Sequence, residues 1–155
     1  MIQRIQTLFL AVVLILSLLF LSGNLITFTN KQGTIINAKL LKEANQLQAI
    51  SSHSKIIINF LVISTIIILF SSVIAISSFK KRKIQLFLTI IIVVLELFNT
   101  VAIVLLIYEL RVGEANNFIP GIRLIIPPIN ILMALLAAKG IRHDENLIKS
   151  YERLR

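Results

Sequence analysis

Four long apolar segments dominate this sequence and leave few folds open to it. They cover residues 8–28, 56–79, 84–108 and 118–138. Each has about 20 residues or more, enough for a helix to cross roughly 30 Å of hydrocarbon at about 1.5 Å per residue. Only 15% of the 155 residues are charged, whereas soluble domains carry about 25%. The chain is therefore not a water-soluble globule, and we predict an all-α membrane protein with four transmembrane helices in an up-down bundle.

The positive charges fall mainly on one side of this predicted membrane domain. With four spans, the N-terminus, the turn after the second span and the C-terminal tail share a side, which holds ten of the 16 Lys and Arg residues. Four of the ten form the run Lys80, Lys81, Arg82 and Lys83. Because cytoplasmic loops are enriched in Lys and Arg, we expect both termini to be cytoplasmic. The run is interpreted first as a topology determinant and second as a contact for anionic lipid headgroups.

The loop after the first span, residues 29–55, is long enough to have structure of its own. Ile36, Leu40, Ala44 and Leu47 recur in it at helical spacing. We expect a short amphipathic helix on the outer membrane face. A loop that gathers substrate or binds a partner is the alternative.

The third span carries a carboxylate at its midpoint. Glu96 is costly there if ionised, so it is a candidate functional residue. Gln85, Thr89, Asn99 and Thr100 fall with Glu96 within an arc of roughly 100°, at about 100° per residue. This polar face must point at protein and not at lipid.

The fourth span has a matching stripe, formed by Arg123, Pro127, Asn130, Ala134 and Ala137. Counted from the external ends of their spans, Glu96 and Asn130 both lie about 18 Å deep, so we predict that they meet across an antiparallel hairpin. Arg123 lies only about 7.5 Å deep. It needs its full length, or a water, to reach Glu96, and it can instead extend outward to headgroups.

Two further patterns concern how the helices pack. The adjacent Pro127 and Pro128 predict an interruption of the fourth helix, which packing explains more simply than a binding site does. In the second span, small residues form a stripe that predicts a packing surface: Ser64, Ser71, Ala75 and Ser78.

The intramembrane polar cluster of Glu96, Asn99, Asn130 and Arg123 has two interpretations. It can serve as a proton or ion relay, or as a polar cavity near the midplane. Alternatively, it links the helices or docks another subunit, with bonds of roughly 0.6 kcal/mol each. We expect no enzyme activity, metal or cofactor, because the chain has no Cys and its two histidines, His53 and His143, fall on opposite sides of the membrane.

After Ala138 the chain becomes polar, so we divide it into a four-helix transmembrane domain, residues 1–140, and a cytoplasmic amphipathic tail, residues 141–155. Apolar side chains recur in this tail at helical spacing, while Glu145 precedes Lys149 at the favourable i,i+4 distance. The tail can lie on the membrane surface or dock a partner. The candidate docking residues are Arg142, Asp144, Glu145, Ile148, Tyr151, Arg153 and Leu154.

Three segments resemble a known family. These are the opening Met1–Thr7, the turn Phe79–Gln85, and the ending from Ile141-Arg142-His143-Asp144-Glu145 to Arg153-Leu154-Arg155. They are similar to an uncharacterised four-helix inner-membrane family of Bacteroidetes bacteria, classed as a domain of unknown function. The resemblance covers the whole chain and implies a bacterial inner-membrane location, but it implies no activity. In the tail, His143 and Asn146 stand where that family tends to have a basic and an acidic residue.

Two function classes follow from these patterns. The first is a non-catalytic accessory or assembly subunit of a larger inner-membrane complex, with other membrane subunits and anionic lipids as partners. The second is a small oligomeric transporter or proton-linked channel that uses Glu96. We expect no contact with DNA, and contact with RNA only within a ribosome-bound complex.

Overall fold

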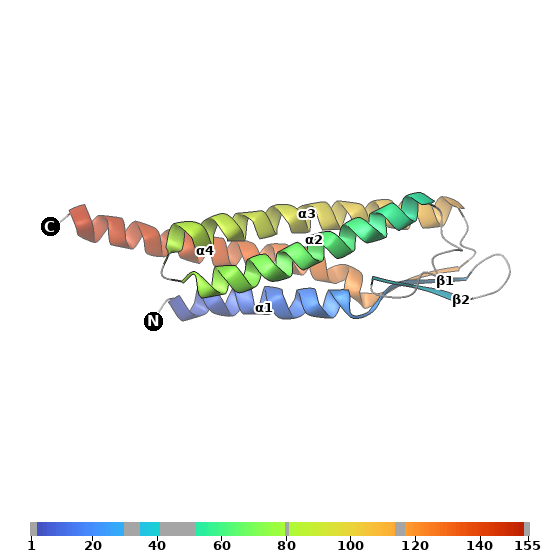
Figure 1. Cartoon of the computed structure of the whole chain (residues 1–155), viewed down its shortest axis with the longest axis horizontal. Helices are drawn as coiled ribbons and strands as arrows, with labels where there is room; N and C mark the ends of the chain where they lie inside the picture. The colour runs from blue at the N-terminus through green and yellow to red at the C-terminus, as the bar shows by residue number, and fades with distance from the viewer. Residues whose placement is uncertain (1–2, 30–34, 41–51, 80, 114–116, 154–155) are drawn as a thin grey trace.

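Four helices lie side by side along the long axis of the molecule (Figure 1). In this computed structural model, residues 3–29, 35–40, 52–79, 81–113 and 117–153 are described. The helices are α1 (Gln3–Leu21), α2 (Ser52–Ser77), α3 (Arg82–Gly113) and α4 (Ile126–Arg153). Both α1 and α3 pack against α2 and α4, so each helix has two neighbours. The prediction of four helices is confirmed.

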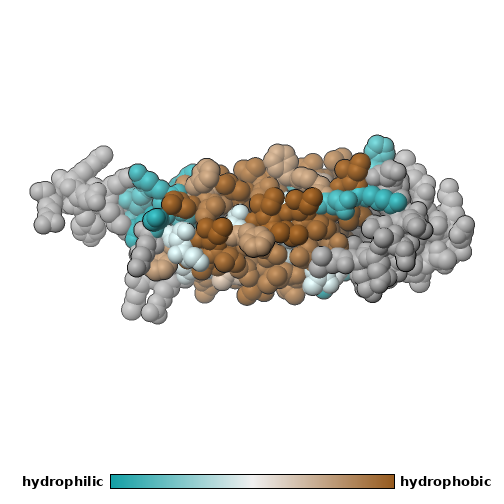
Figure 2. Space-filling view, viewed as in Figure 1, coloured by the Kyte–Doolittle hydropathy of each residue, from teal (hydrophilic) through white to brown (hydrophobic). Residues whose placement is uncertain are grey.

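Three of the four helical segments are long and apolar enough to cross a membrane. They are His53–Ser77, Arg82–Glu109 and Ile122–Asn146. The apolar part of α1, Ile5–Leu21, is shorter. Between the grey ends of the molecule, the visible surface is mostly hydrophobic, with hydrophilic patches toward either side (Figure 2). Because a soluble protein would not expose so continuous an apolar surface, these features indicate a membrane protein.

A small antiparallel sheet, which the sequence did not predict, extends from one end of the bundle (Figure 1). Its strands are β1 (Asn24–Thr29), β2 (Ile35–Lys39) and β3 (Asn117–Pro120), in the order β2-β1-β3. The predicted first span, residues 8–28, is therefore wrong beyond Leu21. Residues 24–29 read Asn-Leu-Ile-Thr-Phe-Thr, and their β-branched and aromatic side chains favour a strand. Hydropathy alone did not separate this strand from the helix before it.

The external amphipathic helix was also predicted wrongly where the structure describes that loop. Ile36 lies in β2, where it pairs with Phe28 of β1. Ala44 and Leu47, the other end of the predicted helix, lie outside the described residues.

The two prolines of the fourth span begin α4 and do not interrupt it. Residues 118–120 belong to β3, and a short 3-10 helix, η2 (Ile122–Ile125), leads directly into α4 at Ile126. Pro127 and Pro128 therefore occupy the first turn, where backbone N–H groups have no partner inside the helix and proline is tolerated. The predicted helix break is corrected to a helix start.

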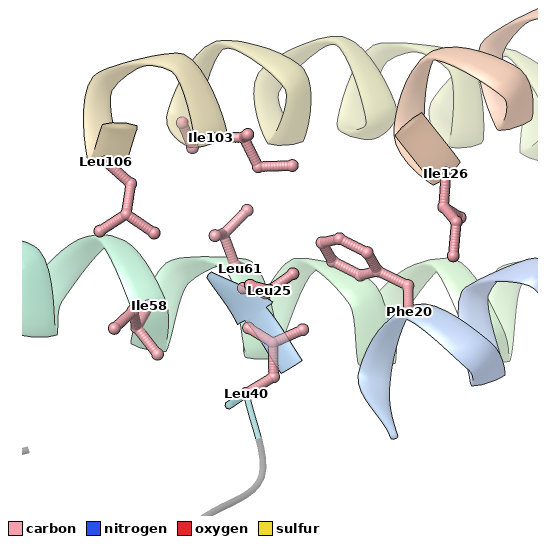
Figure 3. Close-up of a cluster of buried hydrophobic side chains, with 9 residues drawn as sticks. Phe20, Leu25, Leu40, Ile58, Leu61, Ile103, Leu106 and Ile126 are labelled. Carbon is pink, nitrogen blue, oxygen red and sulfur yellow. The ribbon is translucent and has the colours of Figure 1, made fainter. Parts of the chain in front are cut away.

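A buried apolar cluster joins the sheet to the bundle (Figure 3). Its labelled members are Phe20, Leu25, Leu40, Ile58, Leu61, Ile103, Leu106 and Ile126. They come from all four helices and from β1, with Leu40 directly after β2. Leu25 is completely buried. The sheet is thereby packed onto the ends of the helices and continues their core.

Helix α4 runs without a break through Gly140 and into the polar tail. A Cβ on Gly140 would lie 2.9 Å from Cγ of Gln6, so the glycine allows α1 to approach α4 closely. At its C-terminal end, α4 extends beyond the other helices (Figure 1). The amphipathic tail is therefore the continuation of the fourth helix.

Candidate functional site

The strongest candidate site lies inside the bundle, where Glu96 of α3 meets Asn130 of α4. Asn130 Nδ2 donates a hydrogen bond of 2.7 Å to Glu96 Oε1. Only 2% of Glu96 and 1% of Asn130 is exposed. The predicted contact is present, because equal depth on two facing stripes brings the two side chains together. Glu96 points into protein and away from lipid.

A third helix joins this contact through a residue that the sequence analysis missed. Asn130 Nδ2 also lies 3.1 Å from Ser17 Oγ of α1, and Ser17 in turn donates to the Val13 carbonyl at 2.8 Å. Ser17 is the sole polar residue between Thr7 and Ser22, which is the signal that could have identified it. The two Nδ2 hydrogens of one amide therefore link α1, α3 and α4.

The remaining helix, α2, joins through Asn99, which lies one turn after Glu96 on α3. Ser64 Oγ of α2 donates to Asn99 Oδ1, and both side chains are buried. Ser64 belongs to the small-residue stripe predicted to be a packing surface, and Ser71 and Ala75 of that stripe are buried as well. Hydrogen bonds near the middle of the bundle therefore involve all four helices.

The remaining polar residues of the α3 stripe bond mainly along their own helix. Thr89 and Thr100 donate to the carbonyls of Gln85 and Glu96, at 2.7 and 2.8 Å. Gln85 is buried, and its Nε2 has no hydrogen-bond partner in the described part of the chain. The predicted polar face of α3 is thus turned inward, as its spacing indicated.

Arg123 does not lie with Glu96. Its guanidinium occupies the space over Gly23 at the end of α1, where an added Cβ would come within 0.5 Å of Arg123 Nη1. The Nη1 atom is buried and makes no hydrogen bond with the described residues. The C-terminus of a helix carries partial negative charge, so the position after Leu21 is electrostatically favourable for this cation. Arg123 therefore belongs to the junction of η2, α1 and β1.

A second buried polar contact lies at the end of the bundle away from the sheet. Sequence analysis identified one of its residues, Asp144, but not the other, Gln6. Gln6 Nε2 of α1 donates to Asp144 Oδ2 of α4 at 2.6 Å. Arg82 Nη1 of α3 donates to the Asp144 carbonyl at 2.9 Å. Asp144 is only 5% exposed. It was predicted to dock a partner, and this is corrected: its side chain serves a contact within the chain.

The structure describes the other predicted docking and headgroup residues only in part. Lys81, Lys83 and Arg142 are exposed, and Glu145 is partly exposed. Lys80 and Leu154 lie outside the described residues. The side chains of Ile148, Tyr151 and Arg153 are likewise not described, although their backbone lies in α4.

The chemistry available at the central site is hydrogen bonding around one carboxylate. Its neighbours are the amides of Asn130 and Asn99 and, through Asn130, the hydroxyl of Ser17. Over the described ranges, no three His, Asp or Glu side chains are grouped as a metal site would require. The arrangement can therefore hold helices together, or it can place a single ionisable group near the centre of the bundle.

Comparison with known proteins places the whole chain in one family. No curated protein matches it, and neither does any solved structure. A family model does match, over residues 2–154. The chain therefore belongs to the family described as domain of unknown function DUF4293.

Proposed function

We propose that this protein is a non-catalytic accessory or assembly subunit of a larger complex in the bacterial inner membrane. All four helices cross the membrane, both termini are cytoplasmic, and the C-terminal end of α4 contacts the partner. At about 1.5 Å per residue, the apolar segment Ile5–Leu21 of α1 rises about 25 Å, which is at the short end of the range for a transmembrane helix.

The observation that carries this proposal is the length of α4. It continues for nine residues after Asp144, which corresponds to about 13 Å of helix beyond the residue that bonds to α1 and α3. Asp144 fixes the base of this extension through Gln6 and Arg82. A helix held rigidly at its base loses little conformational freedom when its end binds a groove in a partner.

Replacing the extension while keeping its base tests the proposal. The variant exchanges residues 145–155 for eleven Gly and Ser residues, so Asp144 and its bonds are retained. The full chain and the variant are solubilised gently, and the proteins that copurify are identified and quantified. We expect the variant to lose a stoichiometric membrane partner that the full chain retains.

The matched control is Leu132→Ala, on a lipid-exposed part of the same helix. It should retain the partner in full. Equal recovery of the partner with the replaced tail would contradict the proposal, provided that both proteins show the same thermal unfolding in detergent.

Glu96 supports a second candidate function, a small oligomeric transporter or proton-linked channel. A carboxylate buried near the middle of a membrane helix is costly and is often part of an ion or proton pathway. Its contacts with Asn130 and Ser17 also suit a purely structural link between helices. The two functions differ in what they require of the carboxylate.

The substitution Glu96→Gln separates the two functions, because glutamine keeps an oxygen to accept from Asn130 and loses the ionisable group. A subunit should tolerate this change, with partner binding within about twofold of the original. A proton-linked transporter should lose its activity while the complex stays assembled. Loss of cellular function with Glu96→Gln, together with a harmless tail replacement, would favour the transporter.

A further inference from the structure

A shallow, open hollow lies along the outer side of α4, near the end of its apolar segment, with Gly140 at its edge beside α1. Its volume is about 480 Å³, and its lining residues are Leu136, Lys139, Gly140, Arg142, His143 and Asn146. At about 100° per residue they span an arc of about 160°. The buried residues Ala137, Ile141 and Asp144 fall on the opposite side of α4. The hollow therefore opens toward lipid and water.

Contacts with α3 show that the hollow lies level with the basic turn. Arg82, at the start of α3, bonds to the carbonyl of Asp144, which lies within the stretch of α4 that lines the hollow. Lys81 and Lys83 are exposed at the same level. Toward the middle of the bundle, the exposed residues Leu132 and Leu135 continue the outer face of α4. The hollow thus lies where the apolar surface of α4 gives way to cationic side chains.

The lining of this hollow combines cationic and apolar side chains. Lys139 and Arg142 contribute two cations, and no carboxylate lines the hollow among the residues that the structure describes. Two acids lie in this stretch of α4: Asp144 is turned inward toward Gln6, and Glu145 is partly exposed but is not among the lining residues. An anion with an attached apolar chain complements this combination of two cations and a leucine.

We propose that this hollow binds the phosphate of an anionic phospholipid in the cytoplasmic leaflet. Lys139 and Arg142 pair with the phosphate, because both cations line the same hollow. Asn146 and His143 offer hydrogen bonds to the headgroup, and an acyl chain lies on Leu136. The site does not depend on a protein partner at the far end of α4.

The test measures lipid binding to the purified full chain in detergent by native mass spectrometry. Phosphatidylglycerol and phosphatidylcholine are titrated separately. The variant Lys139→Gln/Arg142→Gln removes both cations of the hollow. The control Lys81→Gln/Lys83→Gln removes two exposed cations at the same level on α3. Each cation contributes about 1 kcal/mol to binding of an anionic lipid, so we expect the first variant to weaken phosphatidylglycerol binding by about thirtyfold. The control should weaken it by less than about threefold.

Two outcomes would overturn the proposal. Equal weakening by both double variants would mean that the lipid responds to general charge and not to the hollow. The second outcome is that millimolar inorganic phosphate displaces the bound lipid and that removing the acyl chains does not weaken binding. Together these results would assign the site to a free phosphate. Replacement of residues 145–155 by Gly and Ser removes Asn146 but keeps both cations, so most of the binding should persist even where the docking proposal fails.

Discussion

Asn130 connects three helices of the bundle through one side chain. Its amide donates to Glu96 on α3 and lies within hydrogen-bond distance of Ser17 on α1. The contact with Glu96 could be predicted, because two stripes of equal depth on consecutive antiparallel spans face each other. The contact with Ser17 could not, since periodicity within a helix does not tell which other helix packs beside it.

We predict that Asn130→Leu lowers the free energy of unfolding by about 1–3 kcal/mol, because it removes a hydrogen-bond donor from the buried carboxylate of Glu96. Thermal unfolding in detergent measures the loss. Leu132→Ala, on the exposed face of the same helix, should change stability by less than about 0.5 kcal/mol. Combining Asn130→Leu with Glu96→Met should recover part of the loss, since neither polar partner is then left unpaired. An equal loss in the single and double variants would contradict this account.

The position of Arg123 gives a second prediction at the scale of single residues. An alanine Cβ at Gly23 would occupy the place of Arg123 Nη1, so we expect Gly23→Ala to expel the guanidinium. Arg123→Ala should then cost stability in the original chain and almost nothing in the Gly23→Ala background. A double-mutant cycle should show a coupling of about 0.5–3 kcal/mol, as for residues in contact. Additive effects would place the guanidinium elsewhere.

Among the secondary-structure elements, the helices could be predicted and the sheet could not. Long apolar runs determine α2 and α3 almost to their ends. Strand β1 is also apolar and directly follows α1, so hydropathy merges the two. Its partners β2 and β3 lie about ten and ninety residues further along the chain, and such distant pairing leaves no local periodic signal. The start of α4 was misplaced for the same reason, because β3 and η2 are apolar as well.

Gly121 tests how the sheet is joined to the bundle. Its N–H donates to the Leu25 carbonyl at 2.9 Å, and a Cβ on it would lie 2.5 Å from that same oxygen. Because the atom in the way belongs to the backbone, Gly121→Ala must push β1 aside. We predict a loss of about 1–3 kcal/mol and faster amide hydrogen exchange in residues 24–29. Ile122→Ala, at a neighbouring residue that is 84% exposed, is the control, and equal exchange in the two variants would contradict the prediction.

At the scale of the whole molecule, the two ends differ in structure as well as in charge. One end carries the sheet, and the other carries both termini and the extension of α4 (Figure 1). Among the described residues, the end with the termini holds eight Lys and Arg residues: Arg4, Lys81, Arg82, Lys83, Lys139, Arg142, Lys149 and Arg153. The apolar surface between them is where lipid chains would lie (Figure 2). Since positive loops stay in the cytoplasm, the end with the termini should face inward and the sheet outward.

Single cysteines at the two ends test this orientation, because the chain has no Cys of its own. His53, at the sheet end of α2, and Asn146, at the far end of α4, are both exposed, so replacing either with Cys should not disturb packing. We predict that an impermeant thiol reagent labels His53→Cys in spheroplasts with an intact inner membrane. Asn146→Cys should be labelled only after that membrane is permeabilised, which also controls for its reactivity. Labelling of Asn146→Cys before permeabilisation would show the opposite orientation. It would place the α4 extension and the proposed lipid site at the outer face of the membrane, where the cytoplasmic side of a partner subunit could not reach them.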